Sequence, residues 1–196
     1  MTGFSEEPRA AYSAHMDKAA FFAWLRTREG GRYELKNGEI IVHAGSTMRH
    51  ARLSAKFVTA LSTRLDVDVW AVAASDAAIE IGEDIRYPDV VVERLLDDGS
   101  SPSTTRPTIL IEVLSPSSVG RDMREKRIEY LGLPSLEAYI VASQDEPIVW
   151  IWQRDEASRE FPVEPSEIAG RERAITLDAL AISLPLAELY RGIGAA

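Results

Sequence analysis

The chain has 196 residues, of which 45% are hydrophobic and 27% are charged, so it is long enough for one globular domain with a buried core. It contains no cysteine, which excludes disulfides, thiol nucleophiles and metal sites held by cysteine. Its 22 basic and 31 acidic residues give a net charge of −9, which argues against a protein that binds nucleic acid through its overall charge.

The sequence gives no sign of a membrane or a secretory location. No apolar run approaches the roughly 18 residues that a membrane span needs, and the N-terminus lacks the apolar core of a secretory signal. We therefore expect a cytoplasmic protein. Residues 1–16 are predicted to be a flexible lead-in, and residues 17–196 a single domain.

The first predicted elements are a helix and a β-hairpin. Asp17 is placed to cap a helix that runs to about Arg28 and stops before Gly30-Gly31. Two extended runs within residues 33–42 then flank Asn37-Gly38. Both residues of such a two-residue turn adopt positive φ, which Asn and Gly tolerate, so the pattern predicts a hairpin.

A second helix is predicted from Ser46 or Thr47 to Leu65, because apolar residues recur there at helical spacing. His50 falls within this apolar stripe at the first turn. The adjoining arc carries three basic residues, Arg49, Arg52 and Lys56. This helix contains no acidic residue, so it is a basic element in an acidic chain.

The remaining elements alternate extended and helical segments. Extended segments are predicted at residues 67–74, 77–81, 87–92, 108–114, 138–142 and 148–152, with a weak strand near 161–163. Residues 97–107 have the composition of a loop, and helices are predicted at 121–131 and, as a final turn, at 186–190. Strands with interspersed helices indicate an α/β or α+β domain with a mixed sheet.

Two carboxylates stand inside apolar extended segments, Asp89 before a run of valines and Glu112 within residues 109–114. A buried, ionised carboxylate without a partner costs several kcal/mol, so such a residue binds a cation, pairs with a base, or faces water at a strand end. Two of them on neighbouring strands favour a site for a hard divalent ion. Mg²⁺ takes one or two carboxylates and leaves its other positions to water and substrate phosphate.

The following helix adds a third candidate. Asp122, Lys126 and Tyr130 are spaced four residues apart and so share one face. One interpretation is an ordinary Asp–Lys pair on the surface. The other places the Lys126 ammonium near a metal-bound water, where it would orient the nucleophile and neutralise charge in the transition state.

Taken together, these residues resemble the Uma2 family, also called DUF820, of restriction-endonuclease-like proteins. The resemblance spans about residues 17–190 and keeps the motif order of the family. Its motifs are Tyr33-Glu34-Leu35, Asn37-Gly38-Glu39, His50, Pro88-Asp89, residues 112–118, Asp122, Lys126, Tyr130 and residues 138–141.

The resemblance implies the restriction-endonuclease-like fold of the PD-(D/E)XK nuclease superfamily, an α+β fold in which helices flank a mixed central sheet. Asp89 matches the aspartate of the PD motif and Glu112 the (D/E) position, and both would hold Mg²⁺, with Mn²⁺ as a possible substitute. The sequence departs from the superfamily pattern at Leu114, where a lysine is usual. As in the Uma2 family, Lys126 resembles a replacement that has migrated to the helix.

Two further residues have open roles. Glu34 is similar to an acid that many superfamily members supply to the metal site from an early element, and it could equally face solvent from a hairpin strand. His50 lies on an apolar arc and is either a hydrogen-bonded core histidine or a residue that faces the site.

The leading hypothesis is a Mg²⁺-dependent endonuclease that hydrolyses phosphodiester bonds of nucleic acid, with DNA as the expected substrate. Lys126 would position the water, Glu34 would complete the site, and the substrate backbone would run over Arg49, Arg52 and Lys56. One alternative is a catalytically weak or inactive nuclease-fold protein that acts in nucleic-acid binding, regulation or assembly. The other is a metal-dependent hydrolase of small phosphate esters. We also expect a homodimer.

Overall fold

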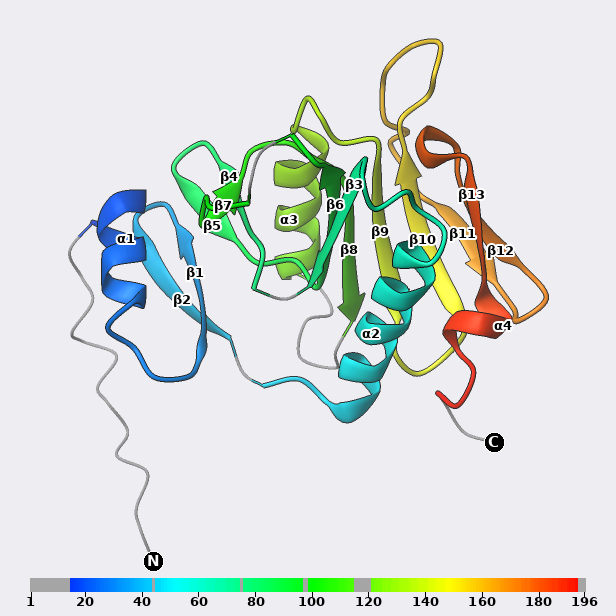
Figure 1. Cartoon of the computed structure of the whole chain (residues 1–196), viewed down its shortest axis with the longest axis horizontal. Coiled ribbons are helices and arrows are strands. Elements are labelled where there is room, and N and C mark those ends of the chain that lie inside the picture. The colour runs from blue at the N-terminus through cyan, green and yellow to red at the C-terminus, as the bar shows by residue number, and fades with distance from the viewer. Residues whose placement is uncertain (1–14, 44, 75, 97–98, 115–120, 194–196) are drawn as a thin grey trace, which may run out of the picture.

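In the computed structural model, the described residues are 15–193 except 44, 75, 97–98 and 115–120 (Figure 1). Within residues 121–123 only the backbone is described. Most of the predicted lead-in, residues 1–14, therefore lies outside the described residues, as do residues 115–118 of the sequence motif.

A six-stranded mixed sheet forms the centre of the domain, as predicted. Its strands lie in the order β11-β10-β9-β8-β6-β3. β8 and β9 run parallel, whereas every other neighbouring pair is antiparallel. The strands are β3 (Trp70–Ala74), β6 (Val90–Arg94), β8 (Pro107–Leu114), β9 (Ala138–Ser143), β10 (Ile148–Gln153) and β11 (Ser166–Ala169).

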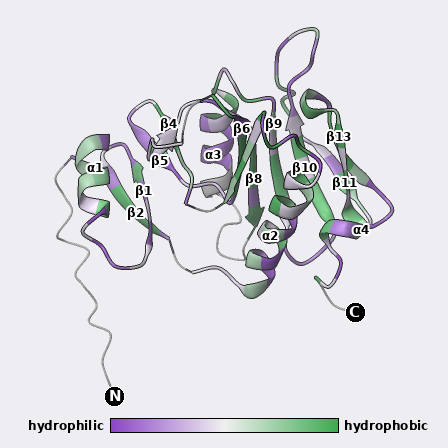
Figure 2. Ribbon diagram, in the orientation of Figure 1, coloured by the Kyte–Doolittle hydropathy of each residue, from purple (hydrophilic) through white to green (hydrophobic). Residues whose placement is uncertain are grey.

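Helices cover both faces of this sheet, which explains why its inner strands are almost continuously apolar. On one face, Val90, Val92 and Ile111 pack with α2 (Met48–Ser62) and α4 (Leu186–Leu189). On the other face, Val91 and Tyr139 pack with α3 (Arg121–Leu131). Figure 2 shows the resulting concentration of hydrophobic residues on β8 and β9 between the helices.

A smaller five-stranded sheet, in the order β2-β1-β5-β4-β7, flanks the central one. Its strands are β1 (Arg32–Lys36), β2 (Glu39–His43), β4 (Ala78–Ile81), β5 (Asp84–Arg86) and β7 (Ser103–Thr104). Helix α1 (Lys18–Leu25) packs on it through Phe21, which lies in one apolar cluster with Leu35 and Ile85.

The local signals in the N-terminal part behave as predicted. Asp17 caps α1 by accepting a hydrogen bond from the Ala20 amide. The β1–β2 turn has φ of 49° at Asn37 and 77° at Gly38, so both turn residues have positive φ. Helix α1 ends at Leu25, three residues before the predicted end. The Trp24 carbonyl accepts from both the amide and the hydroxyl of Thr27, three residues on, so the α-helical hydrogen bonding does not continue.

The C-terminal strands are the main error of the sequence-based prediction. Residues 161–163 form no strand, since Pro162 has no amide to donate to a ladder, and Phe161 packs under the Arg154 guanidinium, whose centre lies 4.3 Å from the ring centroid. The strands of this region are instead β11 and the hairpin of β12 (Ala174–Leu177) and β13 (Ile182–Pro185), followed by the predicted final helical turn, α4. Among the described residues, no helix is both long and apolar enough to cross a membrane.

Candidate active site

The antiparallel register of β6 and β8 brings Asp89 and Glu112 to the same end of the central sheet. Val90 pairs with Ile111, so the residue before β6 lies beside the end of β8. The first turn of α2, one face of α3 and strand β1 reach the same end. These elements contribute His50, Lys126 and Glu34, so all five predicted site residues lie in one cluster.

Asp89 is held by one of its two carboxylate oxygens. The residue is only 4% exposed. Its Oδ2 accepts a hydrogen bond of 2.8 Å from the Val113 amide and lies 3.0 Å from Nε2 of His50. Among the described residues, its Oδ1 has a single long contact, 3.6 Å to Nη2 of Arg32. His50 therefore faces the site, and Oδ1 of Asp89 accepts no hydrogen bond from the described part of the chain.

The two carboxylate oxygens of Glu112 also differ in their contacts with the described residues. Its Oε1 accepts hydrogen bonds of 3.0 Å from both Nζ of Lys126 and the Tyr130 hydroxyl. Its Oε2 accepts no hydrogen bond from the described residues. Burial raises the pKa of Glu112 above the usual glutamate value, and the nearby Lys126 charge offsets part of this effect.

The Lys126 ammonium lies between two carboxylates, 3.0 Å from Oε1 of Glu34 and 3.0 Å from Oε1 of Glu112. Burial alone would lower its pKa, but the charges of Glu112 and then Glu34 outweigh burial and raise it. Lys126 is therefore cationic at neutral pH. Its ammonium thus reaches Glu112 from α3, whereas position 114 on β8 is a leucine.

Glu34 uses both oxygens for contacts within the protein. It is 2% exposed, and its Oε2 accepts a hydrogen bond of 2.9 Å from Arg86 and lies 3.0 Å from Nε2 of His43. Its Oε1 accepts from the Tyr87 amide and from Lys126. Burial would raise the pKa of Glu34, but His43, Lys126 and Arg86 together hold it well below the usual value. Glu34 is thus an anion that anchors cations.

Sequence reasoning missed Arg86, His43 and Glu129. The Arg86 guanidinium, 4% exposed, donates 2.9 Å and 2.8 Å hydrogen bonds to the two carboxylate oxygens of Glu129 as well as its bond to Glu34. The one available signal was a charged residue three positions before Asp89, beside the apolar Ile85. The side chain of Asp122 lies outside the described part of the chain.

The three basic residues of α2 do not form one compact patch at the site. Arg49 lies at the site end, where it pairs with Asp145 at 2.9 Å, and Arg52 is exposed. Lys56 lies farther along the helix towards Glu188, whose pKa is lowered mainly by Arg64 and to a smaller degree by Lys56.

The donor set fits a hard divalent cation. No group of three or more His, Asp or Glu side chains in the described ranges forms a complete metal cage. Asp89 Oδ1 and Glu112 Oε2 are nevertheless two carboxylate oxygens at one end of the sheet that accept no hydrogen bond from described residues. Mg²⁺ needs only one or two protein carboxylates, since water and substrate phosphate supply its other ligands.

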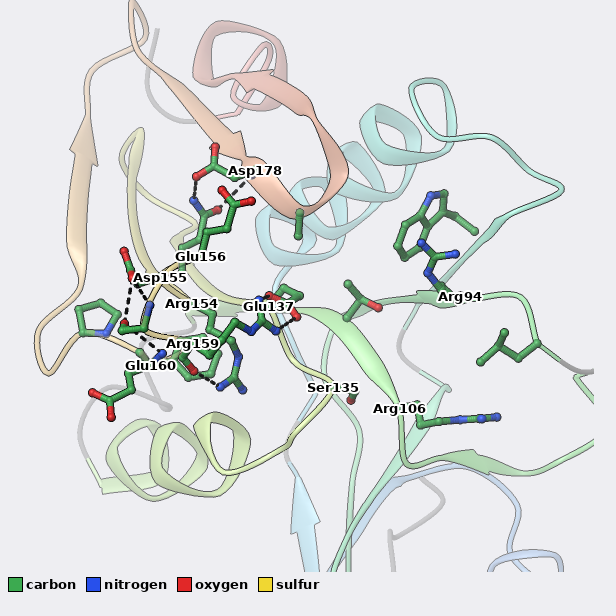
Figure 3. Close-up of a pocket in the computed structure, with 18 residues that line it drawn as sticks. Arg94, Arg106, Ser135, Glu137, Arg154, Asp155, Glu156, Arg159, Glu160 and Asp178 are labelled. Carbon is green, nitrogen blue, oxygen red and sulfur yellow. Dashed lines mark hydrogen bonds and ion pairs between the residues drawn. The ribbon is translucent and has the colours of Figure 1, made fainter.

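A cavity of about 1110 Å³ lies at the opposite end of the central sheet (Figure 3). Arg94 at the end of β6 and Thr108 near the start of β8 line it, whereas Asp89 and Glu112 lie at the other ends of these strands. Figure 3 shows Arg159 paired with Glu137, and Arg154 donates to the Leu136 carbonyl. The cavity is therefore separate from the carboxylate cluster.

Comparison with known proteins agrees with this arrangement. The sequence model of the Uma2 family, described as "putative restriction endonuclease", matches residues 19–187. Two proteins of Synechocystis sp., both named as uncharacterized, are similar in sequence: sll1609 is 33% identical over 57% of this chain and 66% of its own length, and slr1290 is 25% identical over 85% and 87%.

A solved structure shares the fold. It is the crystal structure of a "putative nuclease belonging to DUF820" from Anabaena variabilis, which superposes with a TM-score of 0.72 over 90% of this chain and 98% of that chain. The two sequences are 14% identical, so the likeness shows the fold alone. It confirms the predicted restriction-endonuclease-like fold.

Proposed function

The chain belongs to the Uma2 family, and we propose that it is a Mg²⁺-dependent endonuclease that hydrolyses phosphodiester bonds of nucleic acid, with DNA as its substrate. The observation that carries the proposal is the pair Asp89 and Glu112. Each keeps one carboxylate oxygen free of hydrogen bonds from described residues, and the cationic Lys126 contacts Glu112.

The protein groups around the pair hold it in place. Asp89 and Glu112 would bind Mg²⁺, or Mn²⁺ as a substitute, and the bound ion would lower the pKa of a water and offset charge on the phosphate. The Val113 amide and His50 fix the orientation of Asp89. Tyr130 and Lys126 fix that of Glu112. Both carboxylates are therefore oriented before substrate arrives.

Lys126 acts as a cation rather than as a base, because its carboxylate neighbours keep it protonated at neutral pH. Its ammonium donates hydrogen bonds, so it orients the attacking water and stabilises the negative charge that develops on the phosphate. Glu34 completes the site by anchoring this ammonium, since its own oxygens are already engaged. The substrate backbone is proposed to run over Arg49, Arg52 and Lys56.

The direct test is cleavage of single- and double-stranded DNA with Mg²⁺, with Mn²⁺ and with chelator. We expect Asp89→Asn and Glu112→Gln each to lower the rate by at least about 100-fold. Glu156→Gln, which alters an exposed carboxylate at the opposite cavity, is the matched control and should keep full activity. Undiminished cleavage by Asp89→Asn would refute the assigned site.

A metal titration separates the proposal from its alternatives. Mg²⁺ should raise the unfolding temperature of the wild type but not that of Asp89→Asn. Metal binding without cleavage of any nucleic acid would favour the non-catalytic member of the fold. If mononucleotides inhibit DNA cleavage at a concentration equal to that of the DNA phosphates, a hydrolase of small phosphate esters is favoured.

We also propose that two copies pair through β2, the open edge of the smaller sheet. Val42 on this strand is 66% exposed. In the β1–β2 hairpin, Lys36 pairs with Glu39 across a two-residue turn, so the backbone groups of Ile40 and Val42 point away from β1. An antiparallel pair centred on Ile41 would join these groups and set Glu39 of each copy opposite His43 of the other.

Sedimentation velocity over a range of concentrations tests this pairing. We expect a monomer–dimer equilibrium for the wild type and for Val42→Thr, which keeps the amide. Val42→Pro removes the amide and should be monomeric. A wild-type protein that stays monomeric at about 100 μM, above the dissociation constants of most specific pairs, would exclude the dimer.

A further inference from the structure

Arg86 is a buried cation that touches neither proposed metal ligand. It ends strand β5, and the pairing of Leu35 with Ile85 sets it beside Glu34 on β1. Its guanidinium donates to Glu34 through Nη1 and to Glu129 of α3 through Nε and Nη2. The side chain therefore joins two strands of the smaller sheet to the helix that carries Lys126.

Glu34 divides its oxygens between two cations. Oε2 accepts a hydrogen bond from Arg86 and also lies 3.0 Å from Nε2 of His43, whereas Oε1 contacts Lys126, which in turn contacts Glu112. These contacts form a chain in which each side chain contacts the next, in the order Glu129, Arg86, Glu34, Lys126 and Glu112. Because Arg86 bonds both oxygens of Glu129 and Oε2 of Glu34, the Lys126 ammonium is left to bridge Glu34 and Glu112.

Without Arg86, the Glu34 carboxylate would keep His43 at Oε2 and Lys126 at Oε1, and Lys126 is the partner that it shares with Glu112. A buried carboxylate draws an available ammonium, since unpaired burial costs several kcal/mol. Lys126 would then move towards Glu34 and away from Glu112. Asp89 and the free oxygen of Glu112 would keep their surroundings, because Arg86 contacts neither of them.

We propose that Arg86 is a positioning residue for Lys126, which it holds in place by fixing the Glu34 carboxylate. This inference rests on the proposed function for its kinetic consequence, whereas its structural consequence can be measured without activity. The planar guanidinium is required because it bonds Glu34 and Glu129 simultaneously, which a lysine ammonium does poorly.

The kinetic test compares Arg86→Lys, Arg86→Met and the double variant Arg86→Met/Glu129→Gln. Arg86→Met leaves the buried Glu34 and the half-buried Glu129 without their guanidinium partner, so folding of this variant is at risk. The double variant removes one charge of each sign, so we expect it to fold more readily than Arg86→Met. We expect kcat to fall about 10–100-fold in the double variant, as for other residues that orient a catalytic group, with Mg²⁺ affinity changed less than about twofold.

Arg86→Lys keeps the charge and should recover part of this loss. If Arg86 serves only to neutralise Glu129, the double variant will recover wild-type kcat, and the proposal is overturned. A parallel loss of Mg²⁺ affinity in the double variant also overturns it, because Arg86 would then act on the metal ligands.

The structural test uses lysine labelled with ¹⁵N at Nζ. The chain has only four lysines, Lys18, Lys36, Lys56 and Lys126, so the Lys126 signal can be assigned with Lys126→Arg. We expect this signal to be observable and slowly exchanging in the wild type and shifted or exchange-broadened in the double variant, with the Lys18 signal unchanged. An unchanged Lys126 signal contradicts the proposal. If the wild type cleaves no nucleic acid, the proposed function fails and these spectra alone decide the role of Arg86.

Discussion

At the scale of single residues, two glutamates of the site have opposite pKa shifts because their neighbours differ. Glu34 lies among His43, Lys126 and Arg86, which hold its pKa well below the usual value despite burial. Glu112 is buried with one cation and with the charges of Asp89 and Glu34 nearby, so its pKa is raised. Glu34 is therefore suited to anchor cations. In contrast, binding of a further cation would favour the ionised form of Glu112.

The low pKa of Glu34 predicts a pH-dependent contribution to stability. Because the folded-state pKa lies below the unfolded value of about 4.3, the contribution is fully present above about pH 5 and is lost as the pH falls. Glu34→Gln should lower the free energy of unfolding at pH 7 by about 3 kcal/mol, since it leaves Arg86 and Lys126 undercompensated. Urea unfolding between pH 7 and pH 2.5 should show this difference shrinking towards acid. A difference that stays constant with pH contradicts the prediction.

At the scale of elements, α3 presents three side chains to the site from one face. Lys126 and Tyr130 reach Glu112, and Glu129 holds Arg86. The spacing of Lys126 and Tyr130 predicted the shared face from sequence. This spacing could not predict which residues the face contacts. Arg86 and Glu129 are 43 residues apart in the sequence, and only the packing of β5 against α3 brings them together.

Helix α3 can be tested as a unit by changing a residue that points away from the site. Ile128 is 69% exposed and lies inside the helix. Ile128→Pro should cost about 3 kcal/mol and displace all three side chains, so cleavage should fall by more than tenfold. Ile128→Ala keeps the helix and should keep activity. Equal activity of the two variants would show that the helix does not position the site. Cleavage kinetics would compare the activities of the two variants, and circular dichroism would compare their helix content.

The same contrast between local and distant information explains the remaining errors of the sequence-based prediction. The hairpin at Asn37-Gly38 and the cap at Asp17 depend on neighbouring residues, and both were predicted. Strand β5 has three residues and β7 has two, too few for a recognisable alternation, and β5 is fixed by pairing with β1 and β4. His50 was ambiguous because an apolar arc does not show whether a polar group such as Asp89 lies opposite.

At the scale of the whole molecule, the antiparallel strands β6 and β8 separate two ends of different character. Asp89 and Glu112 mark one end, and the cavity with Arg94 and Arg106 marks the other. The net charge of −9 opposes nucleic-acid binding over the whole surface, so the proposed binding would depend on a few local basic residues and, at the site, on a bound cation. Both ends carry exposed arginines, so a charge reversal at each end compares the two surfaces directly.

Charge reversal at each end decides which end binds DNA. Arg52 on α2 makes no ion pair with the described residues, and Arg94 on β6 stacks on Trp70 at the cavity. Under the proposed path, Arg52→Glu should weaken DNA binding severalfold at low salt and reduce the slope of log K against log salt by about one, the signature of one lost phosphate contact. Arg94→Glu changes the net charge equally and should leave binding almost unchanged. Fluorescence anisotropy with Ca²⁺ in place of Mg²⁺ measures both variants without cleavage. Equal weakening would mean that overall charge governs binding, and weakening by Arg94→Glu alone would move the nucleic acid to the cavity.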